Sequence, residues 1–214
     1  LRESVAPVAL VRAGEADVIL VDGAGFVLLD EVEASPSGAP VLRRLSGDEA
    51  VRAAEGGTAS FIGVAQGRSV VAIETSRDEA WGRWEHLRAV GWQLDGDDAA
   101  LALTALALAG WHANYRFCPC CGAPVQLVTG GWAARCDSCD RLEYPRQDPA
   151  VIVLVRDRRD RVLLAHNALW KPGFVSLIAG YVEAGESPDV AVAREVSEEV
   201  GVAIEDVSYV ATQP

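Results

Sequence analysis

Short hydrophobic runs separated by turn-forming residues dominate the first part of the chain. The runs are four to six residues long and rich in Val, Ile, Leu and Phe, a pattern typical of β-strands. They predict five strands, at 17–21, 26–29, 41–45, 60–64 and 69–74. Segments rich in Gly and Ser at 35–38 and 55–57 predict loops between the strands.

A longer hydrophobic segment at 98–112 predicts a helix. Asp97 is its expected N-cap, because an Asp side chain can accept hydrogen bonds from the free N–H groups of the first turn. Apolar residues occur on nearly all sides of the segment, which indicates burial in the core or in an interface with a partner. The apolar stretch 99–111 is too short to span a bilayer, so we expect no membrane-spanning segment.

Hydrophobic runs return in the last third of the chain. The runs at 150–155 and 161–165, joined by a turn at 158–160, predict a hairpin in a mostly buried sheet. A third strand is predicted at 174–179, ending at Gly180.

A second helix is predicted after this strand. It begins at Pro188 with Ser187 as its N-cap and ends near Val200. Gly201 can then adopt the left-handed conformation that often follows a helix. The expected packing face consists of Val190, Ala193, Val196 and Val200.

The composition is that of a folded, acidic protein. Half of the residues are hydrophobic and 23% are charged, which argues against a disordered chain or a coiled coil. The net charge of −12, from 31 acidic and 19 basic residues, disfavours DNA and membrane surfaces as partners. An anionic ligand therefore needs a local basic site or a bridging cation. No secretory leader follows Leu1, so we expect a cytoplasmic protein, and the absence of Met implies that the initiator is missing.

All the cysteines lie in one short segment. Two Cx₂C turns are separated by 14 residues, and each turn can direct two sulfurs at one point. Disulfides would spread across the fold, whereas four clustered sulfurs suit tetrahedral Zn²⁺ in a closed, structural site. The first turn contains three cysteines, and Gly122 favours a turn that leaves Cys120 spare. The expected zinc ligands are Cys118, Cys121, Cys136 and Cys139.

Three carboxylates gather on the second predicted helix. Glu195 and Glu199 are four residues apart and share a face, and Glu198 lies one turn from Glu195. One interpretation is a solvated acidic face. The other is a site for Mg²⁺ or Mn²⁺, because these cations prefer oxygen ligands and relieve the repulsion among carboxylates. The tight turn at 180–186 directly before the helix favours the cation site.

Residues 180–202 resemble the Nudix box at every position that the box specifies. Five residues separate Gly180 from Glu186, and seven more precede Arg194. The sequence then continues with the three glutamates and Gly201. Nudix hydrolases use this loop–helix–loop to hold divalent cations against a diphosphate.

The resemblance implies a role for each residue of the box. Glu195 and Glu199 are expected to bind the cation, with the backbone carbonyl of Ala179 as a further ligand. Glu198 is expected to be a third ligand or to position and activate water, which makes all three glutamates catalytic candidates. The expected supports of the loop and helix are Gly180, Glu186, Arg194 and Gly201.

A four-cysteine ribbon directly before a Nudix domain resembles the NADH pyrophosphatase subfamily, whose members also remove NAD caps from RNA. This resemblance covers about residues 84–214 and is weaker before them. It implies that Tyr144 contacts the nucleotide, although Tyr144 could equally cover the zinc knuckle. Arg88 is a further expected contact, to phosphate or ribose.

Two departures from the subfamily pattern concern substrate binding. Gly131 stands before Trp132, where the subfamily often has an acidic residue. Gln213 and Pro214 match only the start of the subfamily's Gln-Pro-Trp-Pro-Phe-Pro signature, and we assign them to substrate binding. The chain is therefore expected to be cut within this signature.

Together these features predict an α+β protein in three parts. They are an N-terminal β-rich domain ending in a helix (1–112), a zinc ribbon (113–146) and the incomplete first part of a Nudix α/β/α sandwich with a mixed sheet (147–214). The expected activity is metal-dependent hydrolysis of NAD(H) to nicotinamide mononucleotide and AMP by a homodimer, with NAD-capped RNA as a further substrate.

Two alternatives remain open. The substrate could be another nucleoside diphosphate derivative, such as ADP-ribose or FAD, because the box recognises only the diphosphate. The protein could instead be an RNA-binding module with an inactive Nudix half. The ribbon would then bind RNA through Arg116, Arg135, Arg141 and Arg146.

Overall fold

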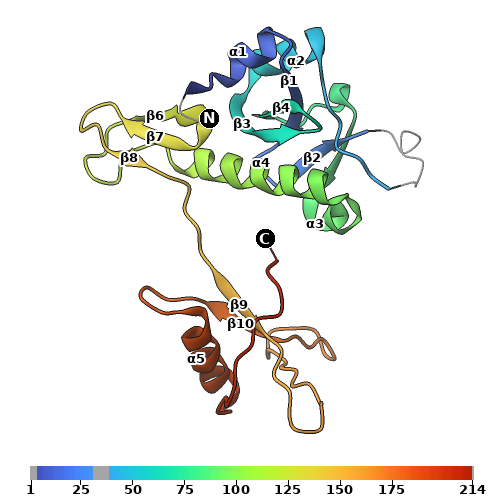
Figure 1. Ribbon diagram of the computed structural model, residues 1–214, viewed down its shortest axis with the longest axis vertical. Helices are drawn as coiled ribbons and strands as arrows, with labels where there is room; N and C mark the ends of the chain where they lie inside the picture. The colour runs from blue at the N-terminus through green and yellow to red at the C-terminus, as the bar shows by residue number, and fades with distance from the viewer. Residues whose placement is uncertain (1–3, 31–38, 214) are drawn as a thin grey trace. The chain divides into compact units, whose positions relative to one another are not determined.

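The structure is a computed structural model that describes residues 4–30 and 39–213. The chain forms two compact units, Leu1–Arg146 and Gln147–Pro214 (Figure 1). The predicted loop at 35–38 and the predicted substrate contact Pro214 lie outside the described residues. Within the described ranges, no helix has the length and hydrophobicity needed to cross a bilayer.

The first unit contains a five-stranded mixed sheet. In spatial order the strands are β3 (Thr58–Ala65), β4 (Arg68–Glu74), β1 (Ala16–Val21), β2 (Phe26–Leu29) and β5 (Arg83–His86). Strands β1 and β4 are parallel, with Val21 opposite Glu74, and the other neighbours are antiparallel. The carboxyl ends of β1 and β4 therefore lie side by side.

Helices cover both faces of this sheet (Figure 1). Successive side chains of a strand point to opposite faces, so Val18 packs in the cluster with helices α1 (Pro7–Arg12) and α2 (Gly47–Gly56). Its neighbour Ile19 packs in the cluster with helix α4 (Gly96–Asn114). Because both faces are buried, the central strands β1, β4 and β2 are mostly hydrophobic, whereas the edge strand β5 is polar and only partly buried. Three short helical elements complete the unit's N-terminal part: η3 (Glu79–Trp81), α3 (Leu87–Val90) and η4 (Gly91–Gln93).

Four of the five predicted strands in this region are confirmed, with bounds within two residues of the expected ones. The strand predicted at 41–45 is wrong, because this segment forms only isolated bridges from Leu42 and Leu45. The loop predicted at 55–57 is also wrong in part, since α2 continues to Gly56. Helices α1 and α2 were not predicted. Helix α2 packs on the sheet through small residues, which give a weak periodic signal: Ala50, Ala53 and Ala54.

Helix α4 begins two residues before the predicted helix and ends two residues after it. Its N-cap is Asp95, whose carboxylate accepts a hydrogen bond from the N–H of Asp98 at 2.8 Å, so the expected cap at Asp97 is wrong. The Asp98 side chain is buried and accepts hydrogen bonds from the Leu42 N–H at 2.8 Å and from the Arg44 guanidinium at 2.6 Å. Asp98 thus fastens the segment before α2 to the start of α4.

The cysteine segment forms a three-stranded antiparallel sheet in the same unit. Its strands are β6 (Val125–Val128), β7 (Ala133–Cys136) and β8 (Leu142–Glu143), with the 3₁₀ turn η5 (Thr129–Gly131) between the first two. Trp132 donates a hydrogen bond from Nε1 to the carbonyl of Phe61 in β3 at 2.6 Å. The buried ring of His112, at the end of α4, is bonded through Nε2 to the carbonyl of Gly131 at 2.8 Å. These two bonds join the ribbon to the N-terminal sheet and to α4.

Gly131 lies at a position that no larger residue fits. Its φ is +94°, and a Cβ atom built there would lie 2.4 Å from the Ser60 hydroxyl oxygen. The glycine before Trp132 is therefore required by the close approach of η5 to β3. An acidic side chain at this position is incompatible with this packing.

The second unit contains two antiparallel strands and one helix. Strands β9 (Ala150–Val153) and β10 (Ile178–Tyr181) pair along their whole length, and helix α5 (Pro188–Val200) packs on them. The segment expected at 161–165 forms isolated bridges, from Val162 to Arg156 and from Ala165 to Ser176, and not a strand. The predicted turn is present, because the carboxylate of Asp157 accepts hydrogen bonds from the N–H groups of Arg159 and Arg161.

Helix α5 has the predicted bounds, with Ser187 as N-cap and Gly201 in the left-handed conformation at φ +67°. Its predicted packing face is wrong in two positions, since Val190 and Ala193 are exposed. Val192, Val196 and Val200 pack in the hydrophobic cluster with the strands, and Ala191 is also buried. Glu195 of the same helix lies close to Gly180 of β10.

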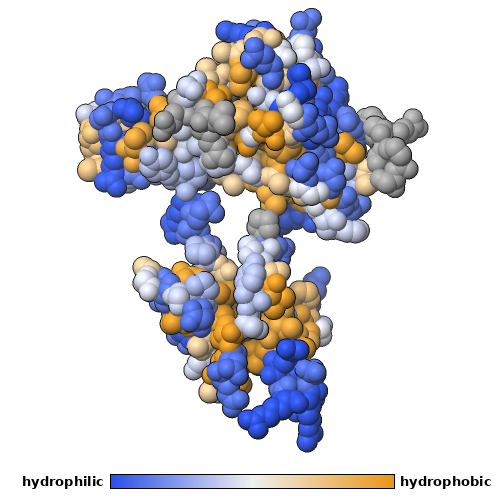
Figure 2. Space-filling model, viewed as in Figure 1, coloured by the Kyte–Doolittle hydropathy of each residue, from blue (hydrophilic) through white to orange (hydrophobic). Residues whose placement is uncertain are grey.

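Much of the second unit's surface is hydrophobic. Large orange areas in Figure 2 cover this unit, and the exposed residues include aromatic side chains of the segment between β9 and β10. Trp170 and Phe174 contact each other edge to face, with ring centres 5.2 Å apart. The large exposed side chains of this region are Ile152, Leu154, Val162, Leu164, Leu169, Trp170, Phe174 and Val175.

Candidate functional site

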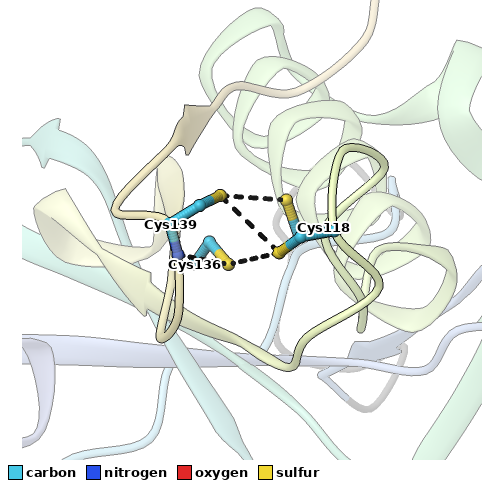
Figure 3. A group of neighbouring side chains, drawn as sticks. Cys118, Cys136 and Cys139 are labelled. Carbon is cyan, nitrogen blue, oxygen red and sulfur yellow. Dashed lines mark hydrogen bonds between the residues drawn. The ribbon is translucent and has the colours of Figure 1, made fainter.

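The sulfurs of four cysteines converge in the ribbon, and Figure 3 shows three of these residues turned toward one another. All four sulfurs lie within 4.8 Å of one another. Individual separations are 3.4 Å for Cys121–Cys136 and 3.7 Å for both Cys118–Cys139 and Cys121–Cys139. The fifth cysteine, Cys120, is exposed and outside the group. The structure therefore brings together the four predicted zinc ligands and leaves the predicted spare residue aside.

The separations fit a tetrahedral zinc site. With Zn–S bonds of about 2.3 Å, the edges of a regular tetrahedron measure about 3.8 Å. The backbone N–H groups of Cys139 and Ser138 donate to the Cys136 sulfur, and they lower the pKa of this thiol to about 6. They therefore favour the thiolate form, which is the form that binds metal. Four sulfurs leave no position for water, so the site suits structural zinc.

Arg194 is the centre of the second group, in the segment that resembles the Nudix box. Its guanidinium binds Glu186 with two hydrogen bonds, from Nε at 2.7 Å and from Nη2 at 2.9 Å. Nη1 donates to Glu195 at 2.9 Å and to Glu198 at 3.1 Å, and Nη2 also donates to the carbonyl of Tyr181 at 2.9 Å. One side chain thus fixes the loop and two of the three helical carboxylates.

Glu186 is held in its ionised form. The hydrogen bonds from Arg194, together with one from the N–H of Glu183, lower the pKa of the Glu186 carboxyl to about 2. A carboxylate with this bidentate partner has a fixed orientation as well as a fixed charge. Glu186 therefore braces the turn that precedes α5.

The Glu195 carboxylate lies directly over Gly180. A Cβ atom at position 180 would lie 1.9 Å from the Glu195 carboxyl carbon, so only glycine leaves space for the carboxylate. Ala179 comes immediately before Gly180 in β10. The glycine of the box thus lets the helix carboxylate approach the strand that carries the predicted carbonyl ligand.

Glu198 and Glu199 are exposed on α5, whereas Glu195 is half-buried. Among the described residues, the cysteines alone bring three or more metal-ligating atoms within 4.8 Å of one another, so the glutamates form no such group. The donors near Gly180 are carboxylate and carbonyl oxygens, which is the chemistry that Mg²⁺ and Mn²⁺ prefer.

The expected substrate contacts belong to different parts of the structure. Tyr144 follows β8 and is 65% exposed, and Arg88 is exposed on α3; both belong to the first unit. Gln213 is exposed in the segment after α5, in the second unit. Sequence reasoning did not identify the Tyr181 carbonyl as a partner of Arg194, because a backbone acceptor leaves no side-chain signal.

The arginines proposed as an RNA-contacting patch are partly occupied by acidic partners. Arg135 pairs with Asp140 at 2.9 Å, and Arg141 pairs with Glu143. Paired arginines have less charge to offer a phosphate. The ribbon therefore gives little support to a basic RNA-binding surface.

Comparison with known families assigns three consecutive regions of the chain. Residues 9–111 match an NADH pyrophosphatase-like rudimentary NUDIX domain, and residues 113–144 match the NADH pyrophosphatase zinc ribbon domain. Residues 146–214 match the NUDIX domain.

Curated relatives show the same relationship. A protein of Mycobacterium bovis named NAD-capped RNA hydrolase NudC is 45% identical over 128 residues, which are 60% of this chain and 41% of that protein. The protein of the same name from Stutzerimonas stutzeri is 42% identical over 141 residues, 66% of this chain and 51% of its own. Nudix hydrolase 19, chloroplastic, of Arabidopsis thaliana is 38% identical over 168 residues, 77% of this chain and 36% of its own.

The matched part is about half or less of each relative's length. The three family matches, in contrast, follow one another along almost the whole of this chain. The chain therefore contains a NUDIX domain, preceded by the rudimentary NUDIX domain and the zinc ribbon of the NADH pyrophosphatase type.

Proposed function

We propose that this protein hydrolyses the diphosphate of NAD(H), releasing nicotinamide mononucleotide and AMP, and that it also removes NAD caps from RNA. The observation that carries the proposal is the arrangement around Arg194, which fixes the box glutamates, with Glu195 seated over Gly180. The names of the bacterial relatives, which specify NAD-capped RNA, support the choice of substrate.

The proposed catalytic residues are the three glutamates of α5. Glu195 and Glu199, with the carbonyl of Ala179, would hold Mg²⁺ or Mn²⁺, and Glu198 would be a third ligand or accept a proton from the attacking water. When bound, the cation neutralises the diphosphate oxygens and lowers the pKa of water. Arg194 holds Glu195 and Glu198 at fixed positions, so they need little rearrangement when substrate enters.

The first unit is proposed to supply the zinc site and further substrate contacts. Cys118, Cys121, Cys136 and Cys139 would hold one structural Zn²⁺ per chain. Tyr144 and Arg88 are the proposed nucleotide contacts, together with Gln213 and Pro214 from the end of the chain. We further propose a cytoplasmic homodimer with the three-part division at residues 112 and 146.

The test is product analysis by chromatography after the protein is given NADH and ADP-ribose in competition, with Mg²⁺ or Mn²⁺. We expect reduced nicotinamide mononucleotide and AMP to form first, and neither to form when the divalent cation is omitted. The Glu199→Gln variant should lower kcat at least about 100-fold, because it removes a charged ligand oxygen.

The matched control is Glu205→Gln, which removes an exposed carboxylate in the same unit whose partner, Arg158, lies 3.7 Å away. This variant should keep the activity. Preferential cleavage of ADP-ribose would contradict NAD(H) as the substrate but would still support metal-dependent hydrolysis of a diphosphate. Binding of RNA without cleavage of either substrate would favour the inactive, RNA-binding alternative.

A further inference from the structure

The first unit contains a cavity of about 880 Å³ whose lining residues have no assigned role in the proposed hydrolysis. Its walls come from four places: the end of α2 with the loop before β3, the end of β4, the last turn of α4 with the residues after it, and strand β6 of the ribbon. The cavity thus opens beside the carboxyl end of β4, which is parallel to β1. Ligands of sheets with parallel strands commonly bind outside the carboxyl ends of those strands.

Glu74, the last residue of β4, is a hydrogen-bond acceptor without a donor. The residue is half-buried, and no group in the described ranges donates to its carboxylate. Burial raises the pKa of Glu74, and the nearby charge of Arg116 opposes this rise. A half-buried carboxylate without a donor is costly for a folded protein, and a ligand with N–H groups would remove this cost.

His112 offers a second acceptor at the same cavity. Its Nε2 lies 2.8 Å from the carbonyl of Gly131, and a carbonyl can only accept, so Nε2 must carry the proton. Burial lowers the pKa of His112, which favours the neutral ring. In the neutral ring Nδ1 is then an acceptor, and no group in the described ranges donates to it.

Arg116 provides the donors. It is exposed, and its guanidinium has no hydrogen bond or ion pair with any described residue. The charged side chains of the lining are Glu55, Glu74 and Arg116, so with neutral His112 the cavity carries a net charge of about −1. Together with the chain's net charge of −12, this lining disfavours a phosphorylated ligand and favours an uncharged one.

The remaining wall contains apolar and aromatic residues. Val125 and Leu127 of β6 line it, together with Tyr115. Tyr115 is itself fixed by stacking on Trp111, with ring centres 5.4 Å apart and planes inclined by 24°. Nucleobases bind proteins by placing their planar faces against aromatic and apolar side chains while their edges form hydrogen bonds.

We propose that this cavity is an accessory binding site for an uncharged nucleoside, held through its base by Glu74 and Arg116. Guanine fits this pair best. Its N1–H and N2–H₂ groups can donate to the Glu74 carboxylate, and its O6 and N7 atoms can accept from the Arg116 guanidinium. The ligand would touch both the N-terminal domain and the ribbon, because Glu74 belongs to the sheet and Leu127 to β6. The proposal does not depend on the proposed hydrolysis.

The test is isothermal titration calorimetry of the zinc-loaded protein with guanosine, in buffer without Mg²⁺ or Mn²⁺. We expect saturable binding with one guanosine per chain, weaker binding of adenosine and uridine, and weaker binding of GMP than of guanosine. Glu74→Gln and Arg116→Gln should each weaken guanosine binding about tenfold or more. The matched controls are Glu15→Gln and Arg12→Gln, which change exposed residues of the same unit outside the cavity. They should leave the affinity for guanosine unchanged.

Several results would overturn the proposal. The first is the absence of guanosine binding, and the second is guanosine affinity in the Glu74 and Arg116 variants equal to that of the wild type. The third is tighter binding of GMP than of guanosine, which would indicate an anion site. If Glu74→Gln unfolds the protein, Arg116→Gln still tests the proposal, because within the described residues the Arg116 side chain has no hydrogen bond or ion pair whose loss would unfold the protein. The affinity for a guanine-containing dinucleoside monophosphate distinguishes two sources of the base. Binding as tight as that of guanosine, or tighter, indicates that the natural ligand is a base of RNA. Weaker binding indicates a free nucleoside.

Discussion

Replacing Gly180 by alanine isolates the contact that seats Glu195. The new Cβ would lie 1.9 Å from the Glu195 carboxyl carbon and 2.0 Å from one of its oxygens. Ordinary van der Waals contact requires about 3.5 Å or more, so the carboxylate must move by well over 1 Å. The backbone at Gly180 does not have a positive φ, so alanine adds no conformational strain and the effect is purely steric.

The expected cost is larger for catalysis than for folding. A catalytic group displaced by about 1 Å can lower the rate about 100-fold, so kcat for NADH should fall by about that factor. Overpacking at one position costs about 1–3 kcal/mol, part of which the Glu195 side chain can avoid by turning to solvent. Because Glu195 would then lose its hydrogen bond to Arg194, the affinity for Mn²⁺ should fall as well.

The assay combines steady-state kinetics with calorimetric titration of Mn²⁺ and a thermal unfolding scan. Gly110→Ala is the control, because its Cβ meets nothing within 4 Å and it lies within α4. It should keep kcat and raise stability by up to about 1 kcal/mol. If Gly180→Ala retains full kcat and Mn²⁺ affinity, then the position of Glu195 over Gly180 does not matter for the reaction, and our reasoning is refuted.

Three further predictions concern the loop before α5, the zinc ribbon, and the packing of the ribbon on β3. The pKa of Glu186 is lower in the folded protein than in the unfolded chain. Its ion pair with Arg194 therefore stabilises the fold fully above about pH 4.5, and this contribution is lost as the pH falls toward 2. In the Glu186→Gln variant, the free energy of unfolding should depend less on pH over this range. Elemental analysis should find about one zinc per chain in the wild type and in Cys120→Ser, but clearly less in Cys118→Ser; equal zinc in both variants would contradict the ligand set. Gly131→Ala should lower the free energy of unfolding, measured by denaturant titration, by about 2 kcal/mol or more. The alanine would have a positive φ, and its Cβ would lie 2.4 Å from the Ser60 hydroxyl oxygen. An unchanged unfolding midpoint would contradict this packing.

Sites encoded by spacing along the chain could be predicted well. The grouping of the four cysteine sulfurs follows from two Cx₂C turns, and the bounds of α5 follow from Ser187, Pro188 and Gly201. In both cases the interacting residues are close in sequence. The local pattern therefore contains most of the geometry.

Features decided by distant contacts could not be predicted. Three aspartates near the start of α4 can each act as a cap. Asp95 does so, while the Asp98 side chain bonds to Leu42 and Arg44, more than 50 residues away. The requirement for glycine at 131 likewise depends on Ser60, a residue of another strand. In α5 the exposed Val190 and Ala193 show that hydrophobic periodicity alone did not identify the buried face of the helix.

Because hydrogen bonds join the ribbon to β3 and α4, metal binding at the ribbon should also depend on the folding of the N-terminal sheet. Because Trp132 is anchored on Phe61 and Gly131 on His112, the folded sheet and the closed four-sulfur group stabilise each other, and the free energy of metal binding is shared between them. Zinc affinity should therefore report the integrity of a domain that contributes no ligand. In the reverse direction, a chelator should lower the melting temperature of the N-terminal sheet.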